Sequence, residues 1–127
     1  LMVRMHTAKT TKAENISLWG TGTARRELLF DEDLAEAIIY LLENYDAKEF
    51  VNVGSGTDST IRELAELIKK IVGYEGEIVL DTSKPDGMPR KLLDVSKIEA
   101  SGWKHKISLE EGLKRSYVSY LKKLANG

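Results

Sequence analysis

The sequence predicts a protein of the α/β class, and three observations lead to this prediction. Short apolar segments that end in glycine or aspartate alternate along the chain with longer segments whose apolar residues recur at helical spacing. The 127 residues are the length of one ordinary domain, and 42% of them are hydrophobic, enough for a core. No low-complexity run, internal repeat or linker divides the chain, so we expect one unit of mixed helices and short strands over residues 1–127.

The first part of the chain contains the patterns of two helices and two strands. We expect the end of a helix at residues 1–10, a strand at 16–19 that is closed by Gly20, and a polar loop at 21–27. A helix at residues 31–45 and an apolar strand at 49–56 should follow. The helix of residues 31–45 begins with three acidic residues, where the helix dipole favours negative charge. Its apolar face is formed by Leu34, Ile38, Leu41 and Leu42.

The second part predicts three more helices and one more strand. Ser or Thr followed three residues later by Glu, the spacing of a capping box, occurs at three helix starts: Thr60 and Glu63, Ser96 and Glu99, Ser108 and Glu111. Gly73 ends the first of these helices and Gly102 the second. A strand of residues 77–81 lies between the first two. The last helix has a core face of Leu113, Tyr117, Tyr120, Leu121 and Leu124.

Composition excludes several classes of function. The 19 Lys and Arg nearly balance the 20 Asp and Glu, and a net charge of −1 argues against a protein that binds nucleic acid or membrane surfaces. Without cysteine there is no disulfide, no thiolate metal site and no cysteine nucleophile. Two histidines are too few for a convincing metal cluster. No apolar run approaches the length of a membrane span, so we expect a cytoplasmic protein.

The segment VNVGSGTDSTIRE has the strand, Gly-x-Gly and helix start that precede a bound phosphate in dinucleotide-binding folds. The third glycine of that fingerprint is missing, since Ser59 stands in its place. A tight turn before a capped helix explains the same pattern. We therefore assign no cofactor-binding residue to this turn.

The segment SKPDGMPRKLLD is the best candidate for a binding loop, because it holds both prolines of the chain, Pro85 and Pro89. Proline fixes its own φ and extends the residue before it, so the cations that follow would emerge from a stiff base and lose less entropy on gripping an anion. The alternative is a stiff connection that only delivers the next residues to the core. Arg25 and Arg26, after the first strand, could hold a phosphate through paired hydrogen bonds, although most arginine pairs are simply solvated.

Three segments together resemble the C-terminal part of the GDP-L-fucose synthases, a family of extended short-chain dehydrogenase/reductases. They are WGTGTARRELLF, VNVGSGTDSTIRELAELIKKIVGYEGEIVLD and SKPDGMPRKLLDVSKIEASGW, and the last is the most specific. The similarity runs from about Arg4 to the final helix. It implies that the chain is the C-terminal nucleotide-sugar-binding portion of such an enzyme, without its Rossmann domain.

The resemblance also implies a function and a set of binding residues. Enzymes of this family convert GDP-4-keto-6-deoxy-D-mannose to GDP-L-fucose with NADPH, through an epimerisation and a reduction. By matching positions, the substrate-binding residues would be Arg4, Trp19, Arg26, Asp86 and Lys91, with Arg90 added from its position and charge alone. The glycine motif for NADPH and the catalytic residues of the family lie upstream of Leu1. We therefore expect no catalytic residue and no bound cofactor in this chain, and a homodimer in the full-length enzyme.

Two alternatives remain open at this point. The chain could be the substrate-binding domain of another nucleotide-sugar epimerase or dehydratase, or a stand-alone α/β binding module without catalysis. The chain begins on an apolar, helix-like run at Leu1, from which we expect it to be a piece of a longer protein. In the absence of the cofactor domain, apolar faces around Ile38, Leu42 and Val51 would be exposed and would favour self-association.

Overall fold

The structure is a computed structural model of the chain, and it describes residues 1–126. It confirms the α/β class, with helices and short strands mixed along the chain. The helices are α1 Met2–Thr10, α2 Asp31–Asn44, α3 Ile61–Val72, α4 Ser96–Ser101 and α5 Leu109–Asn126. The strands are β1 Asn15–Trp19, β2 Arg25–Glu27, β3 Asp58–Thr60, β4 Glu77–Asp81 and β5 Arg90–Lys91.

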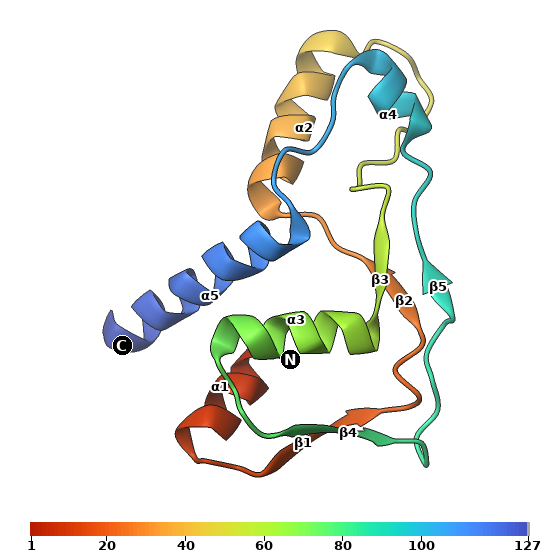
Figure 1. The fold of residues 1–127 in the computed structure, drawn as a ribbon. Helices are drawn as coiled ribbons and strands as arrows, with labels where there is room; N and C mark the ends of the chain where they lie inside the picture. Colours follow the sequence, from red (N-terminus) through yellow and green to blue (C-terminus); the bar gives the residue numbers. More distant parts are fainter. Residues whose placement is uncertain (127) are drawn as a thin grey trace.

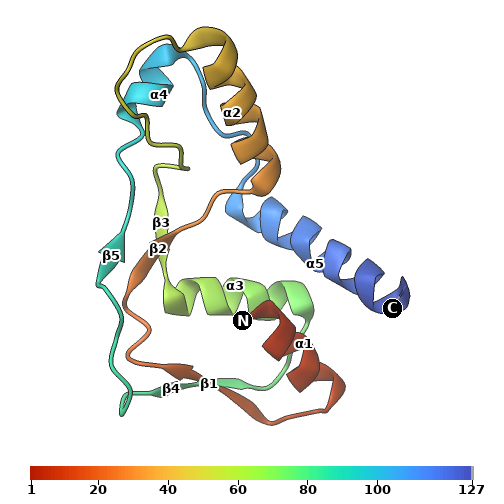
Figure 2. The ribbon, with the colours of Figure 1, turned by 180° about the vertical axis from the view of Figure 1, so that it is seen from behind.

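Two groups of elements lie at opposite ends of the molecule, and a small sheet runs between them (Figure 1). One end holds α1 and α3 over the parallel pair of β1 and β4, and the other holds α2 and α4. The connecting sheet has the strand order β3-β2-β5, with β2 antiparallel to β3 and parallel to β5. The reverse view shows the same division, with α5 starting beside α2 and running past the end that holds α1 and α3 (Figure 2).

Each end has its own apolar core. The larger core joins α1, β1, α3 and α5, and its most buried side chains include Met5, Val72 and Ile68. The smaller core packs α4 against α2 around Ile98, with Trp103 beside it. The segment that links these ends therefore depends on strand pairing and polar contacts more than on a core of its own.

Helix α3 confirms the prediction made from its sequence. The Thr60 hydroxyl accepts a hydrogen bond from the Glu63 amide at 3.0 Å, and the Glu63 carboxylate accepts one from the Thr60 amide at 2.8 Å. Gly73 ends the helix with φ of +69°, in the left-handed region that favours glycine. The other two capping boxes are not complete: Val95, not Ser96, caps α4, and at α5 the Ser108 hydroxyl accepts from the Glu111 amide at 3.2 Å while Glu111 binds Arg115.

Two other predictions were wrong. Residues 21–27 are not a loop throughout, because Arg25–Glu27 is the central strand of the three-stranded sheet. Residues 49–56 are not a strand, since no described strand pairs with them, and the strand of this region is Asp58–Thr60 instead. An apolar extended segment becomes a strand only where a neighbour pairs with its backbone, and a sequence pattern does not identify that neighbour.

Helix α2 turns much of its predicted apolar face to the outside. The exposed fractions of Leu34, Ile38 and Leu42 are 43%, 51% and 81%, whereas Ala37 is fully buried. The expectation of exposed side chains at Ile38 and Leu42 is confirmed, while Val51 is partly buried against the smaller core. No helix among residues 1–126 is both long enough and apolar enough to cross a membrane.

Candidate functional site

The proline loop lies along the segment that leads from β1 into β2, and contacts it at successive points. Asp86 accepts hydrogen bonds from Thr21, through the amide at 2.9 Å and the hydroxyl at 2.7 Å. Further along, the Pro89 carbonyl accepts a hydrogen bond from the Arg25 amide at 2.8 Å. The loop is therefore held in place by the same segment that carries the first two predicted site residues, Trp19 and Arg26.

Asp86 is held close to the backbone of the turn after β1. A Cβ added at Gly20 would lie 2.2 Å from the Asp86 carboxylate oxygen, and Gly20 has φ of +81°, so only glycine fits there. The hydroxyl and then the amide of Thr21 lower the pKa of Asp86, because both donate to its charged form. Asp86 is thus an exposed, ionised acceptor, and a carboxylate has lone pairs left for a ligand hydroxyl.

Arg26 reaches from β2 to the proline loop. Its Nη1 donates to the carbonyl of Met88 at 2.7 Å and to that of Arg25 at the same distance. A Cβ added at Gly87 would lie 3.1 Å from Arg26 Nη2, so the loop passes close to the guanidinium. These contacts leave other guanidinium donors of Arg26 for an anion, since the group carries five N–H bonds.

The strand register brings Arg26 and Lys91 together. They are partners in the parallel pairing of β2 with β5, and paired residues project their side chains to the same face of a sheet. Lys91 is exposed, and its ammonium group takes part in none of the ion pairs within residues 1–126. Ser59 is the partner of Arg26 on β3, so one face of the sheet carries two cations and a hydroxyl side by side. We call this the cationic face: Arg26, Ser59 and Lys91.

Arg90 is not on the cationic face. It pairs with Arg25, one residue before Arg26, and both arginines therefore project to the opposite face. There, Asp58 accepts hydrogen bonds from Arg25 Nε at 2.8 Å and from Arg90 Nε at 2.5 Å. The structure thus gives Arg90 a partner inside the chain, and its predicted contact with substrate stays a prediction.

Trp19 and Arg4 lie beside β1. Trp19 ends the strand with 71% of its surface exposed, and the Lys84 ammonium lies 5.9 Å from its ring centroid. An exposed tryptophan at a loop edge offers a flat surface for a ligand ring or sugar. Arg4, on α1, donates from Nη2 to the carbonyl of Ser17 at 2.6 Å, two residues before Trp19. The structure therefore gathers Trp19, Arg26, Asp86 and Lys91 on two adjoining segments, with Arg4 beside β1.

Glu27 is a residue of this region that the sequence did not single out. Its carboxylate accepts hydrogen bonds from the amides of Gly56 at 2.7 Å and Leu93 at 2.9 Å. A Cβ at Gly54 would lie 2.4 Å from the same carboxylate. The Gly-x-Gly turn therefore contacts an internal anion, and its residues do not fit a dinucleotide pyrophosphate.

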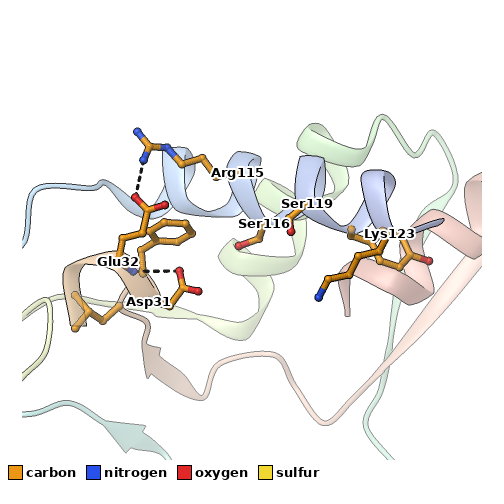
Figure 3. A pocket seen from close by; sticks show the side chains of 9 residues that line it. Asp31, Glu32, Arg115, Ser116, Ser119 and Lys123 are labelled. Atoms are coloured by element: carbon orange, nitrogen blue, oxygen red, sulfur yellow. Dashed lines mark hydrogen bonds and ion pairs between the residues drawn. The ribbon is translucent and has the colours of Figure 1, made fainter. Parts of the chain in front are cut away.

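A hollow lies between the start of α2 and helix α5 (Figure 3), and none of the three cationic-face residues lines it. Two of its four charged side chains, Arg115 and Glu32, bind each other at 3.1 Å, and Arg115 also binds Glu111 at 2.7 Å. Within residues 1–126 no group of three or more His, Asp or Glu side chains is arranged to hold a metal ion. We therefore take the proline loop and the cationic face as the candidate site.

Comparison with known proteins finds relatives over nearly the whole chain. Residues 1–54 match the model of the NAD dependent epimerase/dehydratase family. GDP-L-fucose synthase 1 of Arabidopsis thaliana is 52% identical over 126 residues, which are 99% of this chain and 39% of that protein. GDP-L-fucose synthase of Escherichia coli K12 is 45% identical, over 95% of this chain and 40% of that protein.

Solved structures give the same relationship. GDP-mannoheptose C4 reductase of Campylobacter jejuni, determined with NADP bound, has a TM-score of 0.85 and 38% identity over 94% of this chain and 43% of that one. A GDP-L-fucose synthetase of Naegleria fowleri has a TM-score of 0.90 over 98% of this chain and 39% of that one, but at 22% identity it supports the fold alone.

These matches relate the chain to the extended short-chain dehydrogenase/reductases, the class expected from its sequence. Within that class it is a homologue of the GDP-L-fucose synthases, which confirms the resemblance noted from its motifs. The chain spans 39–40% of the length of these two relatives.

Proposed function

We propose that this chain is the nucleotide-sugar-binding part of an NADPH-dependent epimerase/reductase that converts GDP-4-keto-6-deoxy-D-mannose to GDP-L-fucose. The observation that carries the proposal is the pairing of Arg26 with Lys91 on one face, beside a loop fixed by Asp86. Two cations without internal counter-ions match the roughly two negative charges of a diphosphate. The identity to GDP-L-fucose synthases supports GDP as the nucleotide.

Each residue of the site has a role in this proposal. Arg26 and Lys91 bind the diphosphate, Asp86 accepts a hydrogen bond from a ligand hydroxyl or base, and the Trp19 ring packs against the ligand. Arg4, on α1, is a further residue that binds the substrate. Arg90 remains a candidate contact from its charge and position.

The remaining chemistry belongs to the whole protein. NADPH, when bound, supplies the hydride that reduces the ketone after a neighbouring carbon has been epimerised by proton removal. We propose that the part of the protein that holds NADPH and the catalytic groups lies outside residues 1–127. The residues described above bind and orient the substrate, which by itself contributes to rate. We propose in addition that the full-length enzyme is a homodimer in the cytoplasm, as the family resemblance implies.

Calorimetric titration with GDP at low salt tests the proposal. Arg26→Ala and Lys91→Ala should each weaken binding by about 1–3 kcal/mol, or roughly 5- to 150-fold, the size of a lost charge-assisted hydrogen bond. Lys122→Ala, which removes an exposed cation from α5, is the matched control and should leave the affinity unchanged.

Comparison of nucleotides separates the two enzyme hypotheses. UDP and dTDP should bind much more weakly than GDP if the proposal is right. Equal affinity for all three would favour another nucleotide-sugar epimerase or dehydratase. Full GDP affinity in both Arg26→Ala and Lys91→Ala would refute the cationic face as the site.

A further inference from the structure

The three-stranded sheet has two faces with opposite electrostatic character. Side chains alternate along each strand, so the face opposite to Arg26 and Lys91 carries the residues that precede or follow them in β2, β3 and β5. We call this the paired face: Arg25, Glu27, Asp58 and Arg90. It holds two cations and two anions, whereas the cationic face holds two cations and no carboxylate among its strand residues.

Asp58 is the centre of the paired face. Its side chain is only 4% exposed, and each carboxylate oxygen accepts from one guanidinium, Oδ1 from Arg25 and Oδ2 from Arg90. The hydrogen bonds from Arg90 and then Arg25 lower the pKa of Asp58, so the group stays ionised. In the strand order β3-β2-β5, this carboxylate on β3 reaches past the central strand to the outer one.

Strand β5 depends on the contact between Asp58 and Arg90 to keep its place in the sheet. It is two residues long, Arg90–Lys91, and lies at the edge of the sheet directly after Pro89, within the proline loop. A pairing this short supplies few backbone hydrogen bonds to fix its position. Because Lys91 follows Arg90 and projects to the other face, any movement of Arg90 also moves Lys91 relative to Arg26.

We infer that Asp58 is a positioning residue for the anion site, and that Arg90 acts on the ligand through Asp58. This inference rests on the proposed function, because it concerns how the cationic face is held in a state that binds a diphosphate. The buried carboxylate fixes Arg25 and Arg90 on the paired face. The same contacts hold Arg26 and Lys91 side by side on the cationic face.

The first test compares GDP with guanosine in Asp58→Asn and Arg90→Ala. GDP binding should weaken about tenfold in each variant, the size of one charge-assisted contact, while guanosine binding should not change. A general loss of structure would reduce both affinities. Glu110→Gln, which breaks the 2.8 Å ion pair with Lys114 on α5, is the control and should bind both ligands normally.

The second test is a double-mutant cycle. The double variant combines Asp58→Asn with Arg90→Ala. If Arg90 acts through Asp58, the affinity of the double variant for GDP should be no lower than that of whichever single variant binds GDP less tightly. Arg90→Lys should recover part of the affinity, because an ammonium can still bind Asp58. Multiplied losses in the double variant would show instead that Arg90 contacts the ligand independently, which overturns the inference.

A third measurement does not depend on ligand. Hydrogen exchange at the Arg25 amide, which donates to Pro89 at the start of β5, should be faster in Asp58→Asn and in Arg90→Ala. Unchanged exchange would refute the positioning role. If Arg26→Ala loses GDP binding but Asp58→Asn keeps it, the proposed function stands and this inference fails. If both Arg26→Ala and Lys91→Ala keep full GDP binding, the proposed function fails.

Discussion

Asp86 shows, at the scale of one residue, how a short polar contact fixes a loop that has no core beneath it. The residues of the proline loop are exposed, so its position depends on hydrogen bonds to the neighbouring segment. Asp86 accepts two of them from Thr21. Its carboxylate can lie this close to the backbone of Gly20 only because glycine has no side chain. The charge of Asp86 is therefore coupled to the shape of the site.

This coupling predicts a dependence of stability on pH. Since hydrogen bonds from Thr21 lower the pKa of folded Asp86, its ionised form contributes stability that is fully present above the unfolded pKa of about 3.9. The contribution is lost as the pH falls through the lowered folded pKa. Thermal unfolding of the wild type and Asp86→Asn should thus differ by a constant amount from pH 7 to about 4.5, and the difference should shrink in stronger acid.

A matched substitution makes this result specific. Asp46→Asn replaces an exposed aspartate two residues after the end of α2, and it is the matched control. A gap between wild type and Asp86→Asn that stays the same down to pH 2 would contradict the prediction.

The residues of the paired face also show why only part of the site could be predicted from the sequence. Arg26, Asp86 and Lys91 could be named from family motifs, and Arg90 and Lys91 from charge next to proline. Glu27 and Asp58 could not be named, and Arg25 could not be told apart from Arg26, because the face that Arg25, Glu27 and Asp58 share exists only once three short segments pair in a particular register. Treating residues 21–27 as a loop concealed the alternation that would have separated Arg25 from Arg26.

At the scale of elements, α3 is the best predicted part of the chain, because its signals are all local. The capping box, the apolar stripe and the final glycine lie within 14 residues of sequence, from Thr60 to Gly73, and need no distant partner. Helix α2 is the contrasting case. The helix dipole explains acidic residues at its start, but Asp33 is 2% exposed and accepts hydrogen bonds from the amides of Lys106 and Ile107. The amides of Lys106 and Ile107 come close to Asp33 only when the chain is folded, so this contact could not be read from the sequence.

The cap of α3 predicts a measurable contribution to stability. Thr60→Ala removes the hydroxyl that accepts from the Glu63 amide, and it should lower the free energy of unfolding by about 1 kcal/mol. Thr60→Ser keeps the hydroxyl and should retain most of that stability. Urea unfolding of the three proteins checks this prediction, and equal midpoints for wild type and Thr60→Ala would disprove it.

At the scale of the whole molecule, the two cores leave a large apolar surface uncovered. Leu34, Ile38 and Leu42 follow one another at a spacing of four along α2, and Ile39 and Phe50 are exposed by 58% and 86%. Helix α2 lies at the outer end of the molecule in both views (Figures 1 and 2). Exposure at Ile38 and Leu42 was predicted from the sequence. The lack of a strand at residues 49–56 was not, because strand formation depends on which neighbouring segment pairs with the backbone.

An exposed apolar face of this kind predicts self-association of the 127-residue chain. Burying these side chains against a second copy removes apolar area from water, which is favourable wherever two such faces meet. Light scattering over a range of concentrations should therefore give a mass that rises above that of one chain. Leu42→Lys and Ile38→Lys place a charge on the face and should restore the monomer. Val118→Lys, at an apolar residue of α5 that is 50% exposed, is the matched control and should leave association unchanged. A wild-type chain that stays monomeric at all concentrations would show that this face does not drive association.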